Sequence, residues 1–484
     1  RGIRMKNSVA GQEGQAGPEV GELLSELLAL LGAHRWCFGQ ERTYRRGMAL
    51  VLAEVFAFGR HTVTQLLLTL GVVEGDWSGW YRLFSCGRVQ EEQLATQMVR
   101  ETLRDVGVDE VYAVGTDGTQ IPRSSLHMAG TSWLKALGTA AFRPGIHRAQ
   151  RFVHGCWFTP LADGFSRAIP LRFVPAFPEG AEPAEAKPCK EWEAGLAYIR
   201  WLRRQLDAAG RACQRILYLA DAGYENAALW AQLPAGVIGA LRTAKNRALY
   251  AYLPPSERRR RRLYGPKQST PAELWRQPNG WQRAAVTIRG CKRDLRYRIE
   301  GPLVVRKAAD TPLYLLIVSG QTWVQGKQAQ RRHRQPVAYL VSAQQENDRC
   351  SFPLPAPLLL SWLWQRWEME VAHREMKSSL GIGEKQCWST HSAILTVQWS
   401  VWVYAVLVLA GYRTWQLKPV TTQKPAWSPT PKRWSFNTLW RSYRTELWAT
   451  PPYRAICSPT TTNWLDKETL AAALCNSVTA AARA

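Results

Sequence analysis

The sequence predicts an α/β protein in which a mixed sheet with flanking helices follows a helical N-terminal domain. Apolar residues recur at helical spacing through residues 18–106, which indicates a series of helices. From about Glu110 the period shortens to that of β-strands, and amphipathic helices separate further strand candidates. Antiparallel strands followed by strands linked through helices are the element order of a mixed α/β sheet.

Residues 1–106 form the expected helical domain. The segment "PEVGELLSELLALLGAH" places leucines at helical spacing, and Gly32 near its end suits the C′ position of a helix. "TVTQLLLTLG" is a shorter helix closed by Gly71. Short helices with tight glycine turns and nearby arginines suit a helix-turn-helix-like DNA-binding module. A small helical bundle of any other function would give the same pattern.

The first part of the α/β core is expected within residues 107–245. The run "EVYAVGTDGT" is a strand candidate that carries Asp117 at its end. "RFVHGCWFTP" and "SRAIPLRFVP" are two more strands, and the pair Asp163 and Gly164 between them predicts a hairpin. These three strands are therefore expected to be antiparallel.

A helix and two further strands complete this part of the core. "EWEAGLAYIRWLRRQLDAAG" is an amphipathic helix closed by Gly210. "RILYLADAGYENAALWAQL" reads as a buried strand, an acidic turn at Asp221 and a helix, and "GVIGALRT" as a fifth strand. Strands linked through helices are expected to be parallel.

The rest of the chain divides into an insertion, a second part of the core and a tail. Residues 246–350 form a basic, mostly antiparallel β-rich insertion that contains five consecutive arginines, Arg258 to Arg262. The core resumes over residues 351–415 with one long helix, "APLLLSWLWQRWEMEVAHREMKSSLG", stopped by Gly381. Residues 416–484 are a tail without an assigned role, in which "KETLAAALCNS" predicts a short helix.

The charge of the chain favours a polyanionic partner. The sequence has 63 Lys+Arg against 38 Asp+Glu, a net charge of +25 and a pI near 9.9. Such a surface attracts phosphates and releases their counterions, although a cationic surface without a nucleic-acid partner has the same composition. Ten cysteines without a CxxC or CxxH pair predict neither a zinc ribbon nor a disulfide framework, so a reducing cytosol fits best.

One segment is long and apolar enough to cross a membrane. The run Ile394 to Tyr412 would span a bilayer, but Gln398 and Ser400 interrupt it and both flanks are basic. A buried helix packed on a sheet is apolar all round and explains the run better. No charged region followed by an apolar stretch begins the sequence, so we expect no signal peptide.

Two aspartates lie at the ends of core strand candidates, Asp117 and Asp221. If those strands are neighbours, both carboxylates emerge at one edge of the sheet. Two carboxylates held close together repel, and such a pair is normally retained to bind a divalent cation. Hard oxygen ligands favour Mg²⁺ or Mn²⁺ over zinc. The alternative is that Asp117 caps a turn and Asp221 caps the following helix.

A third acid lies on the long helix of residues 351–415. At about 100° per residue, one face of this helix carries an acid among cations: Arg366, Glu370, His373 and Lys377. Glu368 and Glu375 fall on the opposite face. An acid among cations suits a site that binds a metal and phosphates together, whereas an i,i+4 surface ion pair of Arg366 with Glu370 is the simpler explanation.

The motifs "TDGT", "LADAGYE" and "RWEMEVAHREMKSSLGIG" resemble those of the DDE transposases of bacterial insertion sequences. More narrowly, they resemble the group with the signature Y-x2-R-x3-E-x6-K. Arg366, Glu370 and Lys377 fit R-x3-E-x6-K, while Leu363 stands at the tyrosine position and departs from the pattern. The resemblance covers about residues 105–415.

The resemblance implies an RNase H-like core and a two-metal mechanism for DNA cleavage and strand transfer. Asp117, Asp221 and Glu370 would be the catalytic residues and would hold two Mg²⁺ ions, for which Mn²⁺ can substitute. One ion would activate water or a DNA 3′-hydroxyl, and the other would stabilise the leaving oxygen. By the same resemblance, Arg366 and Lys377 would bind backbone phosphates.

Further DNA contacts and partners complete the expectation. His373 is expected to pack or to contact the DNA backbone, and Arg374 to contact DNA. Arg258 and Arg260 either track DNA or belong to a solvated loop. The expected partner is double-stranded DNA, both the terminal inverted repeats of an insertion sequence and its target, bound by a homodimer in the bacterial cytosol at the nucleoid.

Three other functions remain open from the sequence. A nuclease on the same fold would cut DNA without joining it. A domesticated, non-catalytic DNA-binding protein would keep only the affinity. A membrane-associated protein would insert residues 394–412 into lipid, although we expect no membrane partner.

Overall fold

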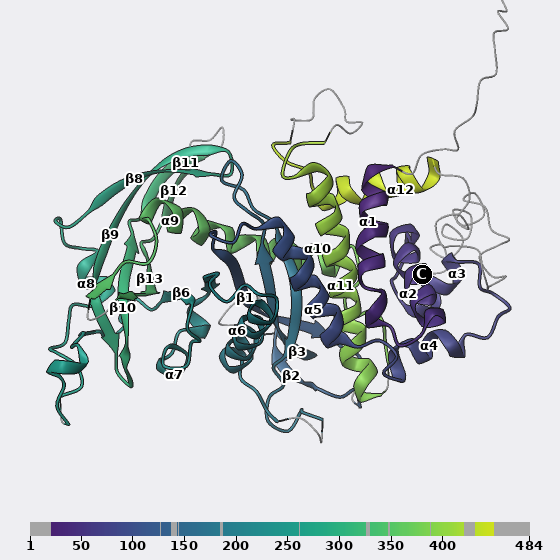
Figure 1. Ribbon diagram of the computed structural model, residues 1–484, viewed down its shortest axis with the longest axis horizontal. Helices are drawn as coiled ribbons and strands as arrows, with labels where there is room; N and C mark the ends of the chain where they lie inside the picture. Colours follow the sequence, from purple (N-terminus) through teal and green to yellow (C-terminus); the bar gives the residue numbers. More distant parts are fainter. Residues whose placement is uncertain are drawn as a thin grey trace, which may run out of the picture.

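The computed structural model describes most of the chain between residues 21 and 449. The described ranges are 21–125, 127–136, 143, 145–183, 187–260, 262–325, 330–346, 349–387, 389–420 and 431–449. The helix expected at "KETLAAALCNS" lies outside them. Figure 1 shows the N-terminal helices at one end of the molecule, the strands of the insertion at the other, and the core sheet between them.

The N-terminal region is helical as predicted. Its α-helices are α1 (Glu22–Ala33), α2 (Glu41–Phe56), α3 (Val63–Thr69), α4 (Ser78–Ser85) and α5 (Glu91–Thr102). The 3₁₀ turns η1 (Arg35–Cys37) and η2 (Leu103–Asp105) follow α1 and α5. Gly71 adopts φ 76°, which explains why glycine closes the α3 segment.

These helices pack around one long buried helix, α11 (Thr390–Trp415). α11 contacts α1, α4, α5 and a strand of the core sheet, and Figure 1 shows it between α1 and the core sheet. By length and composition α11 is the one helix among the described residues that could cross a membrane, but 94% of its most apolar window is buried inside the protein. The interpretation as a buried core helix is therefore confirmed.

The core sheet has the mixed strand order that was predicted. Its strands are β1 (Tyr112–Pro122), β3 (Ile146–Phe158), β4 (Ala168–Pro175), β5 (Ile216–Ala220) and β6 (Val237–Thr243). β3 is antiparallel to both β1 and β4, whereas β5 is parallel to β1 and β6 is parallel to β5. The order β4-β3-β1-β5-β6, three antiparallel strands followed by two parallel ones, is that of an RNase H-like core.

Local features of this core follow the sequence closely. Asp163 and Gly164 both adopt positive φ, as the predicted hairpin between β3 and β4 requires. Helix α6 (Glu191–Ala208) ends before Gly210, which adopts φ 74°. The helix after β5 is shorter than expected, reduced to η3 (Ala222–Tyr224) and α7 (Ala227–Trp230). A short strand, β2 (Thr131–Lys135), pairs with β3 and was not predicted.

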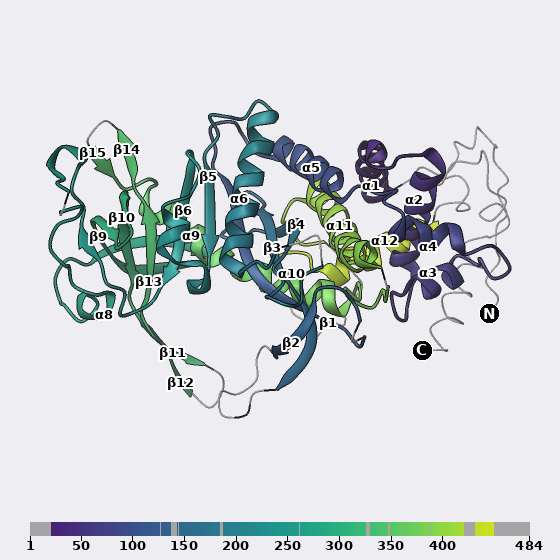
Figure 2. The same cartoon turned by 90° about the horizontal axis from the view of Figure 1, so that it is seen from below.

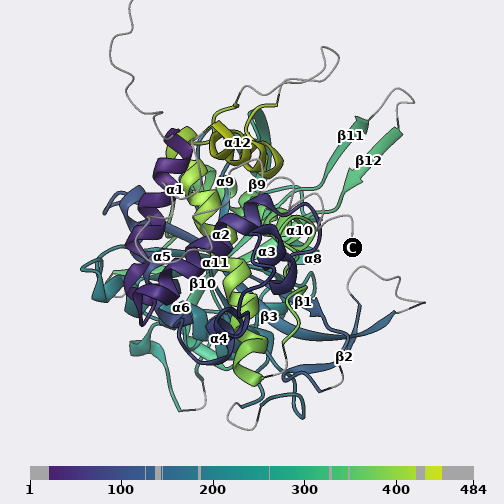
Figure 3. The ribbon, with the colours of Figure 1, turned by 90° about the vertical axis from the view of Figure 1, so that its right-hand side faces the viewer.

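The insertion is antiparallel and rich in strands, as predicted, and it also extends the core sheet. Its elements are β7 (Tyr250–Ala251), η4 (Pro255–Glu257), α8 (Pro271–Leu274), β8 (Gln282–Ile288), β9 (Cys291–Val305), β10 (Ala308–Val318), β11 (Gln321–Gln325), β12 (Gln330–Arg334), β13 (Val337–Ser342), β14 (Gln344–Glu346) and β15 (Arg349–Ser351). β13 pairs with β6, so the described residues form one eleven-stranded sheet. The separate β11–β12 ribbon projects from the same side as β2 (Figures 2 and 3).

The long helix after the insertion is broken in two, contrary to the single helix predicted. α9 (Ala356–Gln365) and α10 (Trp367–Ser378) meet at Arg366. A second unpredicted feature is α12 (Phe436–Ala449), which packs against α1, α2 and α11. Arg444 on α12 donates hydrogen bonds to the carbonyls of Val55 and Ala57 at the end of α2, so part of the tail belongs to the fold.

Candidate active site

Asp117 and Asp221 lie at neighbouring positions of adjacent parallel strands. The β1–β5 ladder aligns Thr116 with Ala220, so the next residue along each chain segment is an aspartate, Asp117 within β1 and Asp221 directly after β5. The sequence predicted Asp117 at the end of a strand. It lies instead inside β1, which continues to Pro122 and pairs there with β3. Asp221 follows the last residue of β5, and its side chain makes no capping hydrogen bond to η3. The capping alternative is therefore wrong for Asp221, whereas Asp117 accepts a hydrogen bond from the backbone N–H of Gly118 but does so within a strand and not in a turn.

Helix α10 crosses β1 closely and brings Glu370 to the same edge. A Cβ atom added to Gly115 of β1 would lie 2.7 Å from Sδ of Met369, so only glycine allows this approach. Met369 is fully buried, and the next residue, Glu370, points toward Asp117. The hydrophobic contact under α10 thus positions the acid beside the aspartates.

Arg366 lies between the acids. Its Nη1 is 3.5 Å from Oδ2 of Asp117, and its Nη2 is 2.9 Å from Oε1 of Glu370. Burial acts to lower the pKa of Arg366, but the charges of Asp117, Asp221 and Glu370 outweigh it and raise that pKa above its usual value. The i,i+4 pair of Arg366 with Glu370 therefore exists, but as part of a site rather than as an isolated surface ion pair.

The acids also act on one another. Burial raises the pKa of Asp117 to about 6; Arg366 opposes this shift, and the charges of Glu370 and Asp221 add to it. Asp221 faces Arg242 of β6, whose Nη1 is 3.5 Å from its Oδ1, and this buried oxygen accepts no hydrogen bond within the described residues. Unmet carboxylate oxygens and mutual repulsion are what a divalent cation relieves, so the donor set fits Mg²⁺ or Mn²⁺ chemically.

The arrangement does not, however, hold the three acids at one point. Among the described residues, no three His, Cys, Asp or Glu side chains are close enough together to hold a single metal ion. Asp117 and Glu370 both contact Arg366. Three carboxylates placed to share a metal ion, as predicted, are therefore not found among the described residues, and the cation between Asp117 and Glu370 is the guanidinium of Arg366.

A small cavity of about 330 Å³ opens beside Asp117 and Glu370. His373 and Glu191, at the start of α6, also line it. Glu191 was not singled out from the sequence, because its position at a helix N-terminus is common for an acid. A Cβ atom added to Gly118 would lie 2.6 Å from Oε2 of Glu191, so the glycine of "TDGT" makes room for this acid.

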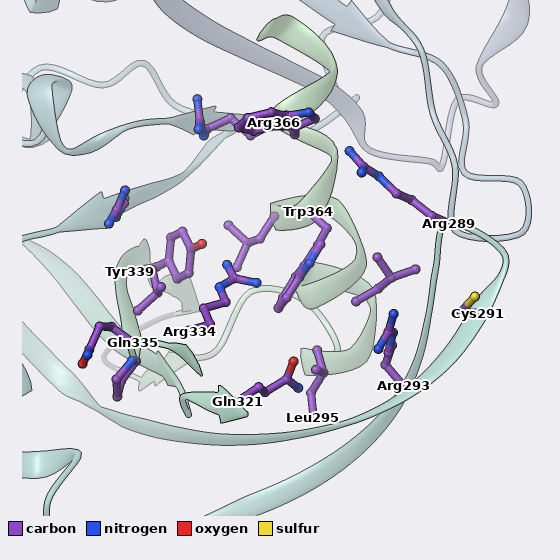
Figure 4. A pocket seen from close by; sticks show the side chains of 16 residues that line it. Arg289, Cys291, Arg293, Leu295, Gln321, Arg334, Gln335, Tyr339, Trp364 and Arg366 are labelled. Carbon is purple, nitrogen blue, oxygen red and sulfur yellow. The ribbon is translucent and has the colours of Figure 1, made fainter. Parts of the chain in front are cut away.

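A larger pocket of about 950 Å³ lies on the insertion side of Arg366. Five arginines line it: Arg242, Arg289, Arg293, Arg334 and Arg366. Tyr339, Trp364 and Trp367 add aromatic rings, and no described acid lines it. Figure 4 shows these side chains around the pocket, with Arg366 at its edge. Its residues come from β6, the insertion and both halves of the broken helix, so single-sequence patterns could not group them.

The histidine on α10 is part of a buried pair. Nε2 of His373 lies 2.8 Å from Nδ1 of His154, the residue opposite Asp117 on β3. Burial, together with a smaller effect of the charge of Lys377, lowers the pKa of His373 to about 3. His373 is therefore neutral at pH 7, and packing is the role that its contacts show.

The other residues of α10 divide as the helical face predicted. Glu368 and Glu375 point away from Asp117 and pair with Arg433 and Arg167 in the interior, so they hold α10 in place. The remaining candidates for DNA contact on this helix, Arg374 and Lys377, are exposed.

The arginine run of the insertion is not brought to the acids. Arg258 pairs with Asp310 and donates to the carbonyls of Leu253 and Ala309, so its guanidinium supports the insertion itself. Arg260 is exposed in the same loop, and neither arginine lines the two cavities beside the acids. DNA contact by these two arginines stays a prediction. Leu363, at the tyrosine position of the signature, is buried in α9.

Comparison with known proteins points to one family. Residues 34–299, more than half of the chain, match the family model described as DDE superfamily endonuclease. The match includes Asp117 and Asp221 and ends before Glu370. No curated protein matches the chain in sequence. A cryo-EM structure of the piggyBac transposase synaptic complex with hairpin DNA is similar with 12% identity and a TM-score of 0.35, covering 92% of this chain and 81% of that one.

Proposed function

The chain belongs to the DDE superfamily endonuclease family, and from this premise we propose that it is a DNA transposase. It would bind the terminal inverted repeats of an insertion sequence, cut the phosphodiester backbone at their ends and join the cut ends to target DNA. The observation that supports the proposal is that Asp117 and Asp221 follow aligned residues of two adjacent parallel strands, and that Arg366 contacts both Asp117 and Glu370 of α10. The origin in a bacterial insertion sequence rests on the motif around Glu370.

The acids would hold the metal that this chemistry needs. A divalent cation, Mg²⁺ with Mn²⁺ as a substitute, would supply Lewis-acid stabilisation of the attacking and leaving oxygens when held by Asp117, Asp221 and Glu370. The chain itself contributes position and charge. Asp117 and Asp221 are fixed by the backbone ladder, and Glu370 is fixed by the buried face of α10. Rigid placement of this kind is what phosphoryl transfer requires of the protein.

The cations beside the acids would hold the DNA. We call the 950 Å³ pocket the arginine pocket. Arg366 is one of the five arginines that line it, and their guanidinium groups suit bidentate contacts with phosphates. Arg366, Arg374 and Lys377 would extend this surface along α10. The net charge of +25 favours binding of a long polyanion by counterion release. Because two transposon ends must be held together, we propose a homodimer on DNA, acting in the bacterial cytosol at the nucleoid.

Removal of each acid tests this function. Asp117→Asn, Asp221→Asn and Glu370→Gln are expected to abolish Mg²⁺-dependent cleavage of a duplex that carries the element's end, while DNA binding measured by fluorescence anisotropy stays within a few-fold of wild type. Asp109→Asn, at an exposed position before β1, is the matched control. Cleavage that survives the loss of one acid would remove that residue from the mechanism.

A nuclease that cuts without joining is the second candidate, and the description of the matching family as an endonuclease favours it. An assay that scores joined products separately from nicks distinguishes the two. Cut ends that never become joined to a supplied target support the nuclease. Binding without any cleavage by the wild-type protein in Mg²⁺ or Mn²⁺ would indicate a domesticated DNA-binding protein.

A further inference from the structure

We propose that Arg366 occupies the cation position of the acidic site while DNA is absent, and that DNA phosphates draw it away so that a divalent metal binds tightly only together with DNA. The proposal rests on the proposed function and adds the order in which DNA and the divalent metal bind. Arg366 would then couple DNA binding to metal binding in addition to contacting phosphates.

The first argument is geometric. The two nitrogens Nη1 and Nη2 of one guanidinium contact carboxylates on two different elements, Asp117 on β1 and Glu370 on α10. A divalent cation held by Asp117 and Glu370 would have to compete with the guanidinium for these carboxylates. Two positive charges held by the same carboxylates also repel each other, so each of the two cations weakens the binding of the other.

The second argument concerns charge. Asp117, Asp221 and Glu370 each act on Arg366 to favour its charged form. Without a cation between them, carboxylates this close would repel. The guanidinium therefore does in the DNA-free protein what a metal would do in the active complex, and a metal can enter only by displacing a favourable contact.

The third argument is that the side chain of Arg366 borders a second site, which could bind an anion. Arg366 lies at the junction of α9 and α10, where the acidic site and the 950 Å³ pocket meet. Figure 4 shows it at the edge of that pocket, on the same side as Arg289. Arg366 already lines this pocket with four other arginines, whose like charges favour its contact with the acids until an anion enters the pocket. A DNA phosphate in the pocket reverses this balance and attracts Arg366 away from the acids.

The expected consequence is reciprocal coupling. If DNA raises the affinity for metal, metal must raise the affinity for DNA by the same factor. Metal affinity of the free protein should be weak and should improve when Arg366 is removed. The same substitution should weaken the coupling, because the group that both ligands move is gone.

The experiment measures Mn²⁺ binding to the full chain by electron paramagnetic resonance, with and without a short DNA duplex. In DNA-free protein, Arg366→Gln is expected to tighten Mn²⁺ binding by at least about tenfold, the effect of removing one adjacent positive charge from a partly buried site. Arg204→Gln removes the same charge from an exposed position on α6 and is expected to change the affinity less than about twofold. Circular dichroism melting confirms that each variant is folded, and Arg366→Lys provides a second variant that keeps the charge.

The outcomes separate this inference from the proposed function. Tighter Mn²⁺ binding in Arg366→Gln that disappears when Asp117→Asn is added supports the competition. Equal Mn²⁺ affinities in wild type and Arg366→Gln overturn it, whether or not the wild type cuts DNA. A duplex that leaves the Mn²⁺ affinity of the wild type unchanged also overturns it. Failure of the proposed function is read separately, from the cleavage and joining assays on the acid variants.

Discussion

His154 and His373 share a hydrogen bond of 2.8 Å that joins β3 to α10, one helical turn from Glu370. Burial lowers the pKa of both rings, that of His373 to about 3. The unfolded chain therefore takes up protons on these rings more readily than the folded protein. The stability that the neutral pair contributes is complete above the ordinary histidine pKa of 6.5 and is lost as the pH falls toward about 3.

We predict that His373→Leu lowers the free energy of unfolding by about 1–3 kcal/mol at pH 7.5, because it leaves the ring of His154 buried without its partner. Between about pH 6.5 and pH 4, the free energy of unfolding of the variant should also fall less than that of the wild type. Urea denaturation across this pH range measures both effects. His391→Leu, at an exposed position, is the control and should change neither. A pH profile identical to that of the wild type would show that the pair does not titrate with unfolding.

The charged form of Asp117 destabilises the folded protein. Burial raises its pKa to about 6, and Glu370 and Asp221 contribute, whereas Arg366 opposes the shift. An acid whose pKa is raised by folding destabilises the folded state above that pKa, where it must ionise. We predict that Asp117→Asn increases the free energy of unfolding by on the order of 1 kcal/mol at pH 8, with a smaller gain at pH 5. Thermal melting at both pH values in chelator tests this, and an equal gain at both would exclude the charge as its cause.

A buried ion group ties the N-terminal helices to the loop after α10. Glu54 of α2 and Lys385 are both fully buried and pair at 2.6 Å, and His61 contacts the same carboxylate. We predict that Lys385→Met alone destabilises the protein by about 3–5 kcal/mol, because it leaves the charge of Glu54 buried without its main partner.

The combined variant Glu54→Leu with Lys385→Met should recover much of that loss, since both charges are then removed from the interior. Denaturant unfolding of the two single variants and the double variant gives the coupling energy. Additive losses would show that the two residues stabilise the protein independently.

The close approach of α10 to β1 depends on Gly115. A Cβ atom there would lie 2.7 Å from Sδ of Met369 and 2.9 Å from the ring of Phe158. We predict that Gly115→Ala costs about 1–3 kcal/mol of stability through overpacking and reduces cleavage by shifting Glu370.

Adding Met369→Ala should restore part of both, because it removes the closer of the two clashing groups and leaves only the ring of Phe158. Gly32→Ala is the matched control, since nothing lies within 4 Å of its added Cβ atom, and it should not reduce either property. Stability lost without any rescue by Met369→Ala would place the strain elsewhere. Thermal melting and the cleavage assay provide the two readouts.

The sequence predicted the positions of those site residues that depend only on the repeat of a single strand or helix. The strand pattern placed Asp117 and Asp221 together, and the helical rotation separated Glu370 from Glu368 and Glu375, as the structure confirms. These inferences needed only the period of a strand and of a helix. The same reasoning did not show that Glu368 and Glu375 hold α10 in the interior, because their arginine partners lie far along the chain.

What the sequence did not predict depends on distant pairing. Nothing in "LWQRWEME" breaks a helix by propensity, so the junction at Arg366 is imposed by tertiary packing. Helix α12 lies within a stretch rich in tryptophan and arginine, and its helical form is supported by contacts with α1 and α2. The arginine pocket gathers residues from β6 to α10 and has no linear signature.

The pairing of β6 with β13 has a consequence for how this protein can diverge. Arg242 lies opposite Tyr339 in that ladder, and both face the arginine pocket. Deleting one residue from β13 would turn its alternating side chains over, so Tyr339 would leave the pocket wall. The loops between the outer strands can change length without such a penalty. Relatives of this chain should therefore vary in the length of the loops between the outer strands of the insertion. They should keep the same number of residues in β6 and β13, where the insertion pairs with the core.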